Sequence, residues 1–151
     1  MTFIPVNIKE AETLWWWRLV LEGLDKLMAT NWGEESVEHV LENLRTKVLF
    51  LYIIFDNDNK YAGFFTVKKF LGTFKNEEAG SLIVNHTYRP DKKFNRQDSL
   101  AVEAYIEQLA NEADCKFIRT YTRRKAERYA QMLGYTPVYT EYIKSLTGET
   151  L

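Results

Sequence analysis

Residues 48–88 read VLFLYIIFDNDNKYAGFFTVKKFLGTFKNEEAGSLIVNHTY, and this stretch decides the class of fold. It opens on a continuous β-favouring run, 48–55, which ends at the turn-forming residues 56–59. We expect a return strand over Tyr61–Phe70 and a third strand over Ser81–Tyr88. The loop between these two strands contains Gly72, Asn76 and Gly80. Three neighbouring strands of this kind predict an antiparallel meander.

Two helices are expected upstream of the meander, after a short apolar segment at residues 3–6. Residues 9–28 carry apolar side chains at spacings of three and four, which marks one face of a helix. These are Leu14, Trp17, Leu21, Leu24 and Met28. A second helix is expected after Gly33, where the same spacing recurs. Its apolar positions are Val37, Val40, Leu41 and Leu44.

Downstream of the meander, helices and strands are expected to alternate. A helix over 100–113, with Asp98 or Ser99 as N-cap, precedes a strand over 116–121. A further helix begins after Thr122 and ends at Gly134, and a last strand covers 138–146. The order β-α-α-β-β-β-α-β-α-β predicts an α/β (α+β) fold, with a mixed, mostly antiparallel sheet flanked by helices. No linker divides the sequence, so we expect one domain over residues 1–151.

Composition and charge exclude several classes of protein. The net charge of −1 gives no long-range attraction to nucleic acid, so nucleic acid is not an expected partner. One cysteine and two histidines cannot form a disulfide or a closed zinc site, and no metal is expected. The longest apolar runs are too short to cross a bilayer, and the N-terminus shows no leader pattern. These features predict a protein of a reducing cytoplasm that does not bind membranes.

Three consecutive tryptophans, at positions 15–17, indicate a contact surface. Successive helix positions face in three directions, so at least one of these side chains should be exposed. Exposed tryptophan is enriched at binding hot spots, which favours a protein-binding face that includes Trp15 and Trp16. The alternative is that neighbouring loops cover all three. Cys115 is expected to be a small buried residue without catalytic activation.

The expected element order, together with two local patterns, resembles the GNAT superfamily of acetyl-CoA-dependent N-acetyltransferases. The segment 96–101 is similar to the family's phosphate-binding pattern Gln/Arg-x-x-Gly-x-Gly/Ala, and it lies at the expected junction of strand and helix. Its residues are Arg96, Gln97, Asp98, Ser99, Leu100 and Ala101. The segment 123–135 resembles the family pattern Asn-x-x-Ala-x-x-x-Tyr-x-x-x-Gly-Phe through Ala126, Gly134 and Tyr135. The resemblance implies that amides at a helix N-terminus hold the cofactor's pyrophosphate beside a splayed fourth strand.

Several positions depart from the family's patterns. Ser99 replaces the middle glycine, Arg123 replaces the asparagine, and Ala130 aligns with the tyrosine that often protonates the departing thiolate. The strand 81–87 has no acid that could serve as base, which leaves His86 as the catalytic candidate. A local hydrogen-bonding role for this histidine is the alternative.

Two functions follow from the resemblance. The preferred one is a catalytically degenerate module that binds protein, similar to the GNAT-like proteins of tailed bacteriophages, and it acts in the host cytoplasm or in the virion. Its partner-binding residues would be the tryptophans at 15 and 16 and the basic residues Arg123 and Arg124. The alternative is an active N-acetyltransferase that binds acetyl-CoA and modifies an amine.

Overall fold

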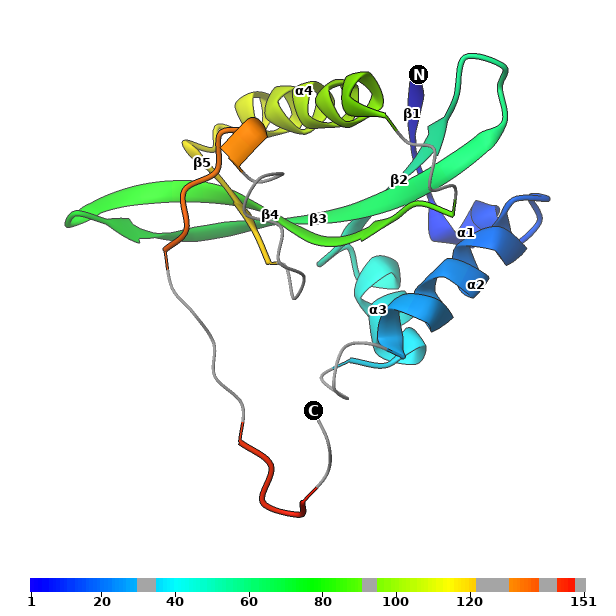
Figure 1. Cartoon of the computed structure of the whole chain (residues 1–151), viewed down its shortest axis with the longest axis horizontal. Helices are drawn as coiled ribbons and strands as arrows, with labels where there is room; N and C mark the ends of the chain where they lie inside the picture. Colours follow the sequence, from blue (N-terminus) through cyan, green and yellow to red (C-terminus); the bar gives the residue numbers. More distant parts are fainter. Residues whose placement is uncertain (30–34, 91–94, 122–130, 139–143, 149–151) are drawn as a thin grey trace. The chain divides into compact units, whose positions relative to one another are not determined.

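Five strands form one sheet in the order β1-β2-β3-β4-β5, which a computed structural model of the chain shows in Figure 1. The structure describes residues 1–29, 35–90, 95–121, 131–138 and 144–148. The strands are β1 Thr2–Pro5, β2 Phe50–Phe55, β3 Tyr61–Phe74, β4 Glu77–Tyr88 and β5 Phe117–Thr120. The helices are α1 Ile8–Ala11, α2 Trp17–Met28, α3 Val37–Arg45 and α4 Arg96–Glu112. The first three strand pairs are antiparallel and β4 pairs with β5 in parallel, so the predicted mixed, mostly antiparallel sheet is confirmed.

The chain divides into two compact units, Met1–Tyr121 and Thr122–Leu151, and the sheet belongs to the first. In the second unit, residues 131–132 are helical and the chain turns at Gly134, whose φ of +83° suits glycine. The helix predicted after Thr122 and the strand predicted over 138–146 lie largely outside the described residues. Val138 and residues 144–146, which are described, are not in a strand. The expectation of one domain over the whole chain stays a prediction.

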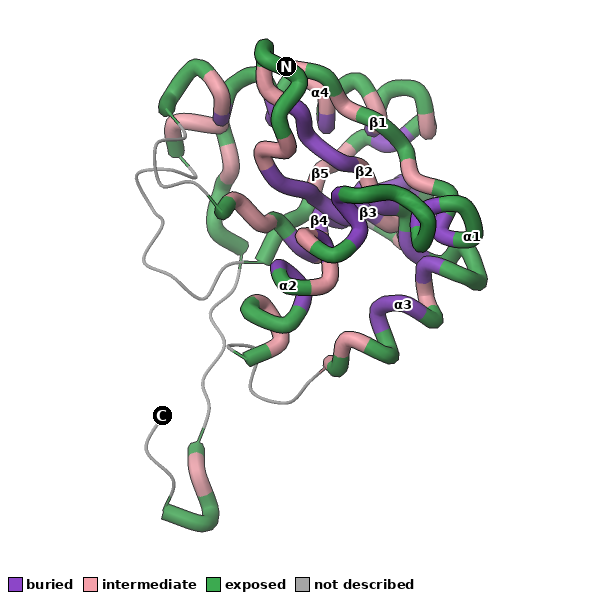
Figure 2. The backbone as a smooth tube through the Cα atoms, turned by 90° about the vertical axis from the view of Figure 1, so that its right-hand side faces the viewer, coloured by how far each residue is buried: buried purple, intermediate pink, exposed green. Residues whose placement is uncertain are grey.

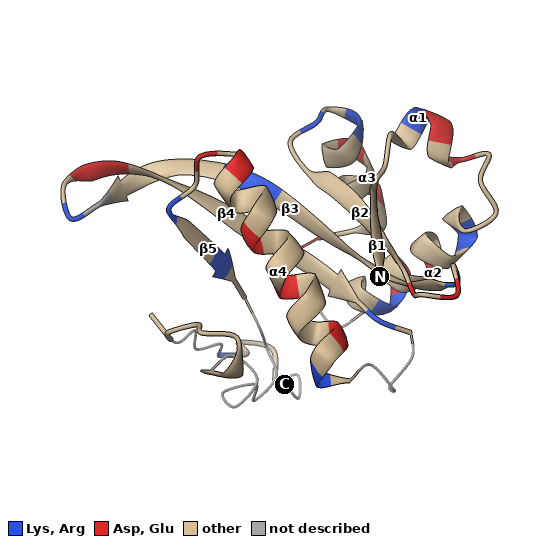
Figure 3. Cartoon of the chain, turned by 90° about the horizontal axis from the view of Figure 1, so that it is seen from above, with Lys and Arg blue, Asp and Glu red and all other residues tan. Residues whose placement is uncertain are grey.

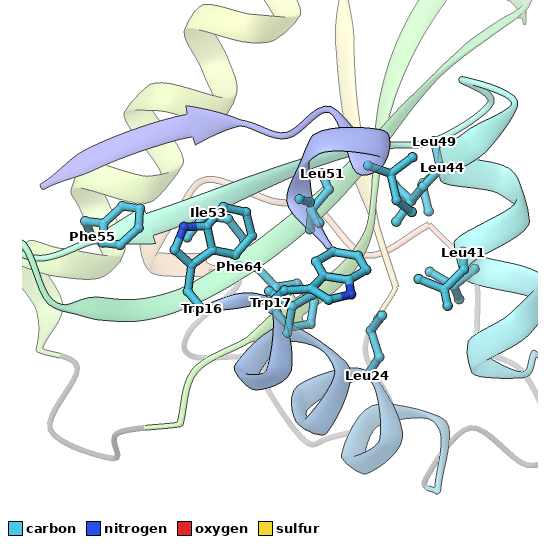
Figure 4. Close-up of a cluster of buried hydrophobic side chains, with 14 residues drawn as sticks. Trp16, Trp17, Leu24, Leu41, Leu44, Leu49, Leu51, Ile53, Phe55 and Phe64 are labelled. Carbon is cyan, nitrogen blue, oxygen red and sulfur yellow. The ribbon is translucent and has the colours of Figure 1, made fainter. Parts of the chain in front are cut away.

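Helices cover both faces of the sheet, and each face has its own apolar core (Figure 1). On one face, α2 and α3 pack Leu24 and Leu41 against Ile53 and Phe64 of the sheet (Figure 4), and α1 adds Ile8 to the same core. On the other face, α4 packs against a second set of strand residues. That set includes Ile54, Phe65, Val67, Leu82 and Val84. The central strands are buried along much of their length (Figure 2), because helices exclude water from both sides.

The first predicted helix is wrong in its extent, because the chain bends between α1 and α2. Asn7 caps α1, which ends at Ala11, and Thr13 then donates from both its amide and its hydroxyl to the carbonyl of Glu10. Trp16 precedes the first residue of α2 and has helical backbone angles, with φ −80° and ψ −8°, and Trp17 begins the helix. Both tryptophans are buried, at 7% and 8% exposure.

The predicted loop between the second and third strands of the meander is also shorter than expected. β3 continues to Phe74 and β4 begins at Glu77, so Gly72 and Gly80 lie inside strands. The connection is the pair Lys75 and Asn76, whose φ values are +50° and +66°. Two successive residues with positive φ form the tight turn whose twist matches an antiparallel hairpin.

Helix α4 begins earlier than predicted, because its cap is Asn95 and not Asp98 or Ser99. The Asn95 side chain accepts a hydrogen bond from the Asp98 amide at 2.8 Å, and the Asp98 carboxylate accepts one from the Asn95 amide at 3.3 Å. This reciprocal pair is a capping box, and it fixes the first turn of the helix.

Gly63 occupies a position in β3 that only glycine fits without distortion. Its φ is +145°, and a Cβ added there would lie 2.2 Å from the carbonyl oxygen of Tyr88. We expect Gly63→Ala to lower the free energy of unfolding by about 2–3 kcal/mol, measured by urea denaturation. Gly72→Ala on the same strand is the control, because its Cβ meets only the movable ring of Phe70. Equal stability losses in the two variants would contradict this account.

Tyr61 has a buried hydroxyl without a hydrogen-bond partner among the described residues. Burial, with smaller contributions from Tyr88 and Glu22, raises its pKa above the ordinary value of 10.0. We expect Tyr61→Phe to stabilise the fold by about 0.5–1 kcal/mol at neutral pH, because an unsatisfied polar group leaves the interior. The raised pKa stabilises the folded state below pH 10 and this contribution disappears as pH rises further. The advantage of the phenylalanine variant in urea denaturation should therefore grow above pH 10, and a variant less stable than wild type at pH 7 would contradict the prediction.

Candidate functional site

Strands β4 and β5 pair over a short length and then part. The paired residues run from Ser81 opposite Phe117 to Val84 opposite Thr120, where β5 ends. β4 continues to Tyr88. Beyond Val84, the side of β4 that faces away from β3 therefore has no strand partner among the described residues. Backbone groups on this edge are available to an extended ligand.

A β-bulge lies at the point where the two strands part. Thr66 of β3 is opposite His86, and the next β3 residue, Val67, is opposite Val84, so Asn85 is an extra residue on β4. The side-chain oxygen of Asn85 is buried and has no hydrogen-bond partner among the described residues. A buried acceptor of this kind suits a donor supplied by a ligand.

The bulge turns His86 toward the face of the sheet that carries α1, α2 and α3. There the Thr66 hydroxyl lies 2.6 Å from His86 Nδ1, and the Glu35 carboxylate lies 2.8 Å from His86 Nε2. Thr66 is fully buried and the His86 side chain is 6% exposed, whereas the Glu35 side chain is 28% exposed. The predicted catalytic residue is therefore the buried middle member of a row that opens toward solvent at Glu35.

The N-terminus of α4 lies beside the end of β4. Arg89, which directly follows β4, donates from Nη1 to the Ser99 hydroxyl at 3.1 Å. Ser99 is 4% exposed, so its side chain packs inside the domain and does not line an open phosphate loop. The serine that replaces the family's glycine thus joins the end of β4 to the first turns of α4.

Only two of the six predicted cofactor-binding residues keep an unbonded backbone amide. Asn95 accepts from the amides of both Asp98 and Ser99, and Leu100 and Ala101 lie within the helix, where amides bond to preceding carbonyls. The amides of Arg96 and Gln97 have no intrahelical partner, and both residues are exposed. The amides that could bind a phosphate are therefore those of the first two residues of the predicted segment, and not those around Ser99.

The charges at this helix end have both signs. Arg96 lies at the start of α4, and Asp98 follows in its first turn. Figure 3 shows that acidic residues continue along α4 toward its C-terminus. A phosphate at the N-terminus would be attracted by the guanidinium and the helix dipole and repelled by the carboxylate.

The two predicted partner-binding tryptophans separate in the structure. Trp15 is 67% exposed, whereas Trp16 belongs to the core beside Trp17, with ring centroids 6.5 Å apart. Trp16 is therefore unavailable to a partner, and Trp15 remains. The predicted residues Arg123 and Arg124 lie outside the described residues. Cys115 is 9% exposed, as the sequence predicted.

Other site types find little support in the described part of the chain. No group of three or more histidine, cysteine, aspartate and glutamate side chains there could hold a metal ion. No helix there combines the length and apolar composition of a membrane span. A hollow of about 230 Å³ lies between α4 and β5, and none of the predicted site residues lines it.

Four residues at the site were missed by sequence analysis: Glu35, Thr66, Asn85 and Arg89. An acid was expected within the strand 81–87, but Glu35 comes from the segment before α3, 51 residues from His86 along the chain. No spacing rule joins positions so far apart. The one available signal was the Asn85-His86 pair itself, because polar residues interrupt a run of apolar strand positions there.

The sequence matches no family model and no curated protein. Many solved structures nevertheless share the fold. An aminoglycoside N-acetyltransferase, AAC(6')-Iy, in complex with CoA aligns with a TM-score of 0.63 at 16% identity, over 95% of this chain and 98% of that one. A glucosamine-6-phosphate N-acetyltransferase from Arabidopsis thaliana aligns with a TM-score of 0.61 at 15% identity, over 97% and 99%.

A GNAT family acetyltransferase from Staphylococcus aureus aligns with a TM-score of 0.59 at 18% identity, over 97% of this chain and 100% of that one. These alignments extend over nearly the whole of both chains, and the first two enzymes are named for different acceptor substrates. The chain therefore has the fold of the GNAT N-acetyltransferases.

Proposed function

We propose that this chain binds acetyl-CoA where β4 and β5 part and transfers the acetyl group to an amine. The observation that carries the proposal is the edge of β4 beyond Val84, which has no strand partner in the described part of the chain. This edge begins at the Asn85 bulge and ends beside the N-terminus of α4. An edge of this kind can hydrogen-bond the amides of a pantetheine arm as a neighbouring strand would. The CoA complex of the aminoglycoside acetyltransferase, which has the same fold, supports this assignment.

The residues present fit the phosphate end of CoA as well. The free amides of Arg96 and Gln97, together with the guanidinium of Arg96, form an anion site at the start of α4. Arg89 is held beside them by its bond to Ser99. Bound there, the thioester supplies an activated acyl group, and the protein's contribution is to position an amine against it.

The geometry favours the enzyme over the binding module that sequence analysis preferred. The polar row of Thr66, His86 and Glu35 and the buried oxygen of Asn85 are costly in a fold interior. Both adjoin the open edge of β4, where a reaction with the thioester would take place. Buried polar groups of this kind favour a role in catalysis, because they do not stabilise the apolar core.

A protein-binding module is the second candidate, and the exposure of Trp15 favours it. A large apolar side chain that is 67% exposed, next to two buried tryptophans, suits a contact with another protein. The capping box of α4, which occupies two amides and adds a negative charge, would weaken phosphate binding. The association with a bacteriophage virion stays a prediction from sequence.

Calorimetric titration with acetyl-CoA tests the enzyme proposal. We expect saturable binding to the wild type and about tenfold weaker binding to Arg96→Glu, because a phosphate contact is replaced by repulsion. Lys26→Glu in α2 is the matched control, since it makes the same charge change at an exposed position on another helix. Absence of binding at millimolar acetyl-CoA would exclude the enzyme and leave the module.

The carboxylate of Asp98 gives a second prediction with the opposite sign. We expect Asp98→Asn to bind acetyl-CoA roughly threefold more tightly, because a negative charge beside the phosphates is removed. Glu107→Gln is the control on the same helix, nine residues further on and therefore about 13 Å away, beyond most electrostatic influence in physiological salt. Unchanged or weaker binding by the Asp98 variant would place the phosphates elsewhere.

A further inference from the structure

Thr66, His86 and Glu35 form a hydrogen-bonded row that runs from a buried hydroxyl to a partly exposed carboxylate. The row begins at the fully buried Thr66 hydroxyl, passes through the imidazole and ends at a carboxylate whose side chain is 28% exposed. It lies one residue along β4 from the bulge at Asn85. His86, which holds Glu35 by its Nε2, therefore lies in the part of β4 whose outer edge has no strand partner among the described residues.

The protonation of the row follows from the chemistry of its ends. An ionised carboxylate can only accept hydrogen bonds, so His86 Nε2 carries a hydrogen and donates it to Glu35. Nδ1 contacts the Thr66 hydroxyl, which can donate to a neutral ring or accept from a charged one. Both ring nitrogens are thus engaged inside the protein, and neither offers a free lone pair to a substrate.

The solvent exposure of the three side chains indicates which of them a substrate can reach. Thr66 has no access to solvent, which excludes it as a nucleophile despite its contact with a histidine. The buried ring of His86 cannot reach an acceptor amine. The Glu35 carboxylate is the member that a substrate can approach.

We infer that Glu35 is the proton acceptor for the incoming amine and that His86 is a positioning residue that holds its carboxylate. This assignment deepens the proposed function and rests on it. In the reaction, the amine nitrogen bonds to the carbonyl carbon of the thioester and the carbon–sulfur bond breaks. The proton of the amine passes to Glu35, and the departing thiolate takes a proton from water. Thr66 orients the ring of His86 from the other side, as second partners commonly orient catalytic histidines.

Glu35→Gln tests the assignment with little change in structure, because the glutamine oxygen still accepts from Nε2. With acetyl-CoA and a panel of primary amines (spermidine, kanamycin and a lysine peptide), release of CoA thiol should fall about 100-fold in kcat. The affinity for acetyl-CoA and the melting temperature should stay at their wild-type values. Glu38→Gln, in the first turn of α3, is the matched control and should keep full activity.

A spectroscopic measurement tests the row independently of turnover. The chain has two histidines, so ¹⁵N-histidine labelling with His39→Gln isolates the ring signals of His86. We expect Nε2 to carry a hydrogen in the wild type and in Glu35→Gln. Glu35→Ala should shift the Nε2 signal, because the hydrogen-bond acceptor is removed. A wild-type ring without a hydrogen on Nε2 would overturn the assignment.

The outcomes separate the inference from the function on which it rests. Amine acetylation that proceeds at the wild-type rate in Glu35→Gln would remove Glu35 as the base and leave the acetyltransferase in place. A wild type that fails to bind acetyl-CoA, or binds it and acetylates none of the amines, would remove the proposed function and the assignment together. Partial recovery of kcat in Glu35→Asp would support a role for the carboxylate itself.

Discussion

The antiparallel pairing of β3 with β4 is the interaction on which the rest of this structure depends. It runs from Phe64 opposite Tyr88 to Phe74 opposite Glu77. Strands β1 and β2 are added on the β3 side of this pair, and β5 is added on the β4 side. Side chains that face each other across the pair share one side of the sheet, so the register decides which core each residue joins. Phe65 and Val67 face α4, whereas Phe64 faces the three N-terminal helices.

One extra residue in β4, Asn85, changes which face of the sheet the side chain of His86 occupies. Without the extra residue Asn85, position 86 would lie opposite Phe65 and its side chain would face the apolar core under α4. With it, His86 lies opposite Thr66 and meets Glu35. The same irregularity coincides with the end of pairing between β4 and β5. The bulge thus brings His86 to the polar row at the point of β4 where the pairing with β5 ends, so the two halves of the candidate site lie together.

The fold was more predictable than the site, for physical reasons that particular segments show. The strands β2 and β4 contain continuous β-favouring runs that are buried along much of their length, and α3 carries apolar residues at helical spacing that are buried on one face. The bend before Trp17 contains neither glycine nor proline. It precedes two adjacent tryptophans that are both buried in one core, and such tertiary packing is not encoded in a local pattern. The bulge at Asn85 has the same character, because it is defined by the pairing of β4 with β3.

The six-residue segment after Asn95 illustrates how a resemblance can be right in place and wrong in detail. It lies at a helix N-terminus beside the end of β4, as the resemblance implied. Its amides are distributed differently, however, because Asn95 caps the helix one turn earlier than expected. A capping side chain and a phosphate compete for the same donors, so the quality of the cap limits the strength of the anion site.

The two-residue connection at Lys75 and Asn76 also has a consequence for the order in which this protein folds. A hairpin with so short a closure forms within microseconds, since little chain entropy is lost before its strands pair. β5 must instead wait for α4 to cross over the sheet, because parallel strands cannot be joined directly. The longest pairing therefore assembles first, and the parting of β4 from β5 is established late. We expect the hairpin to pair before the site is complete.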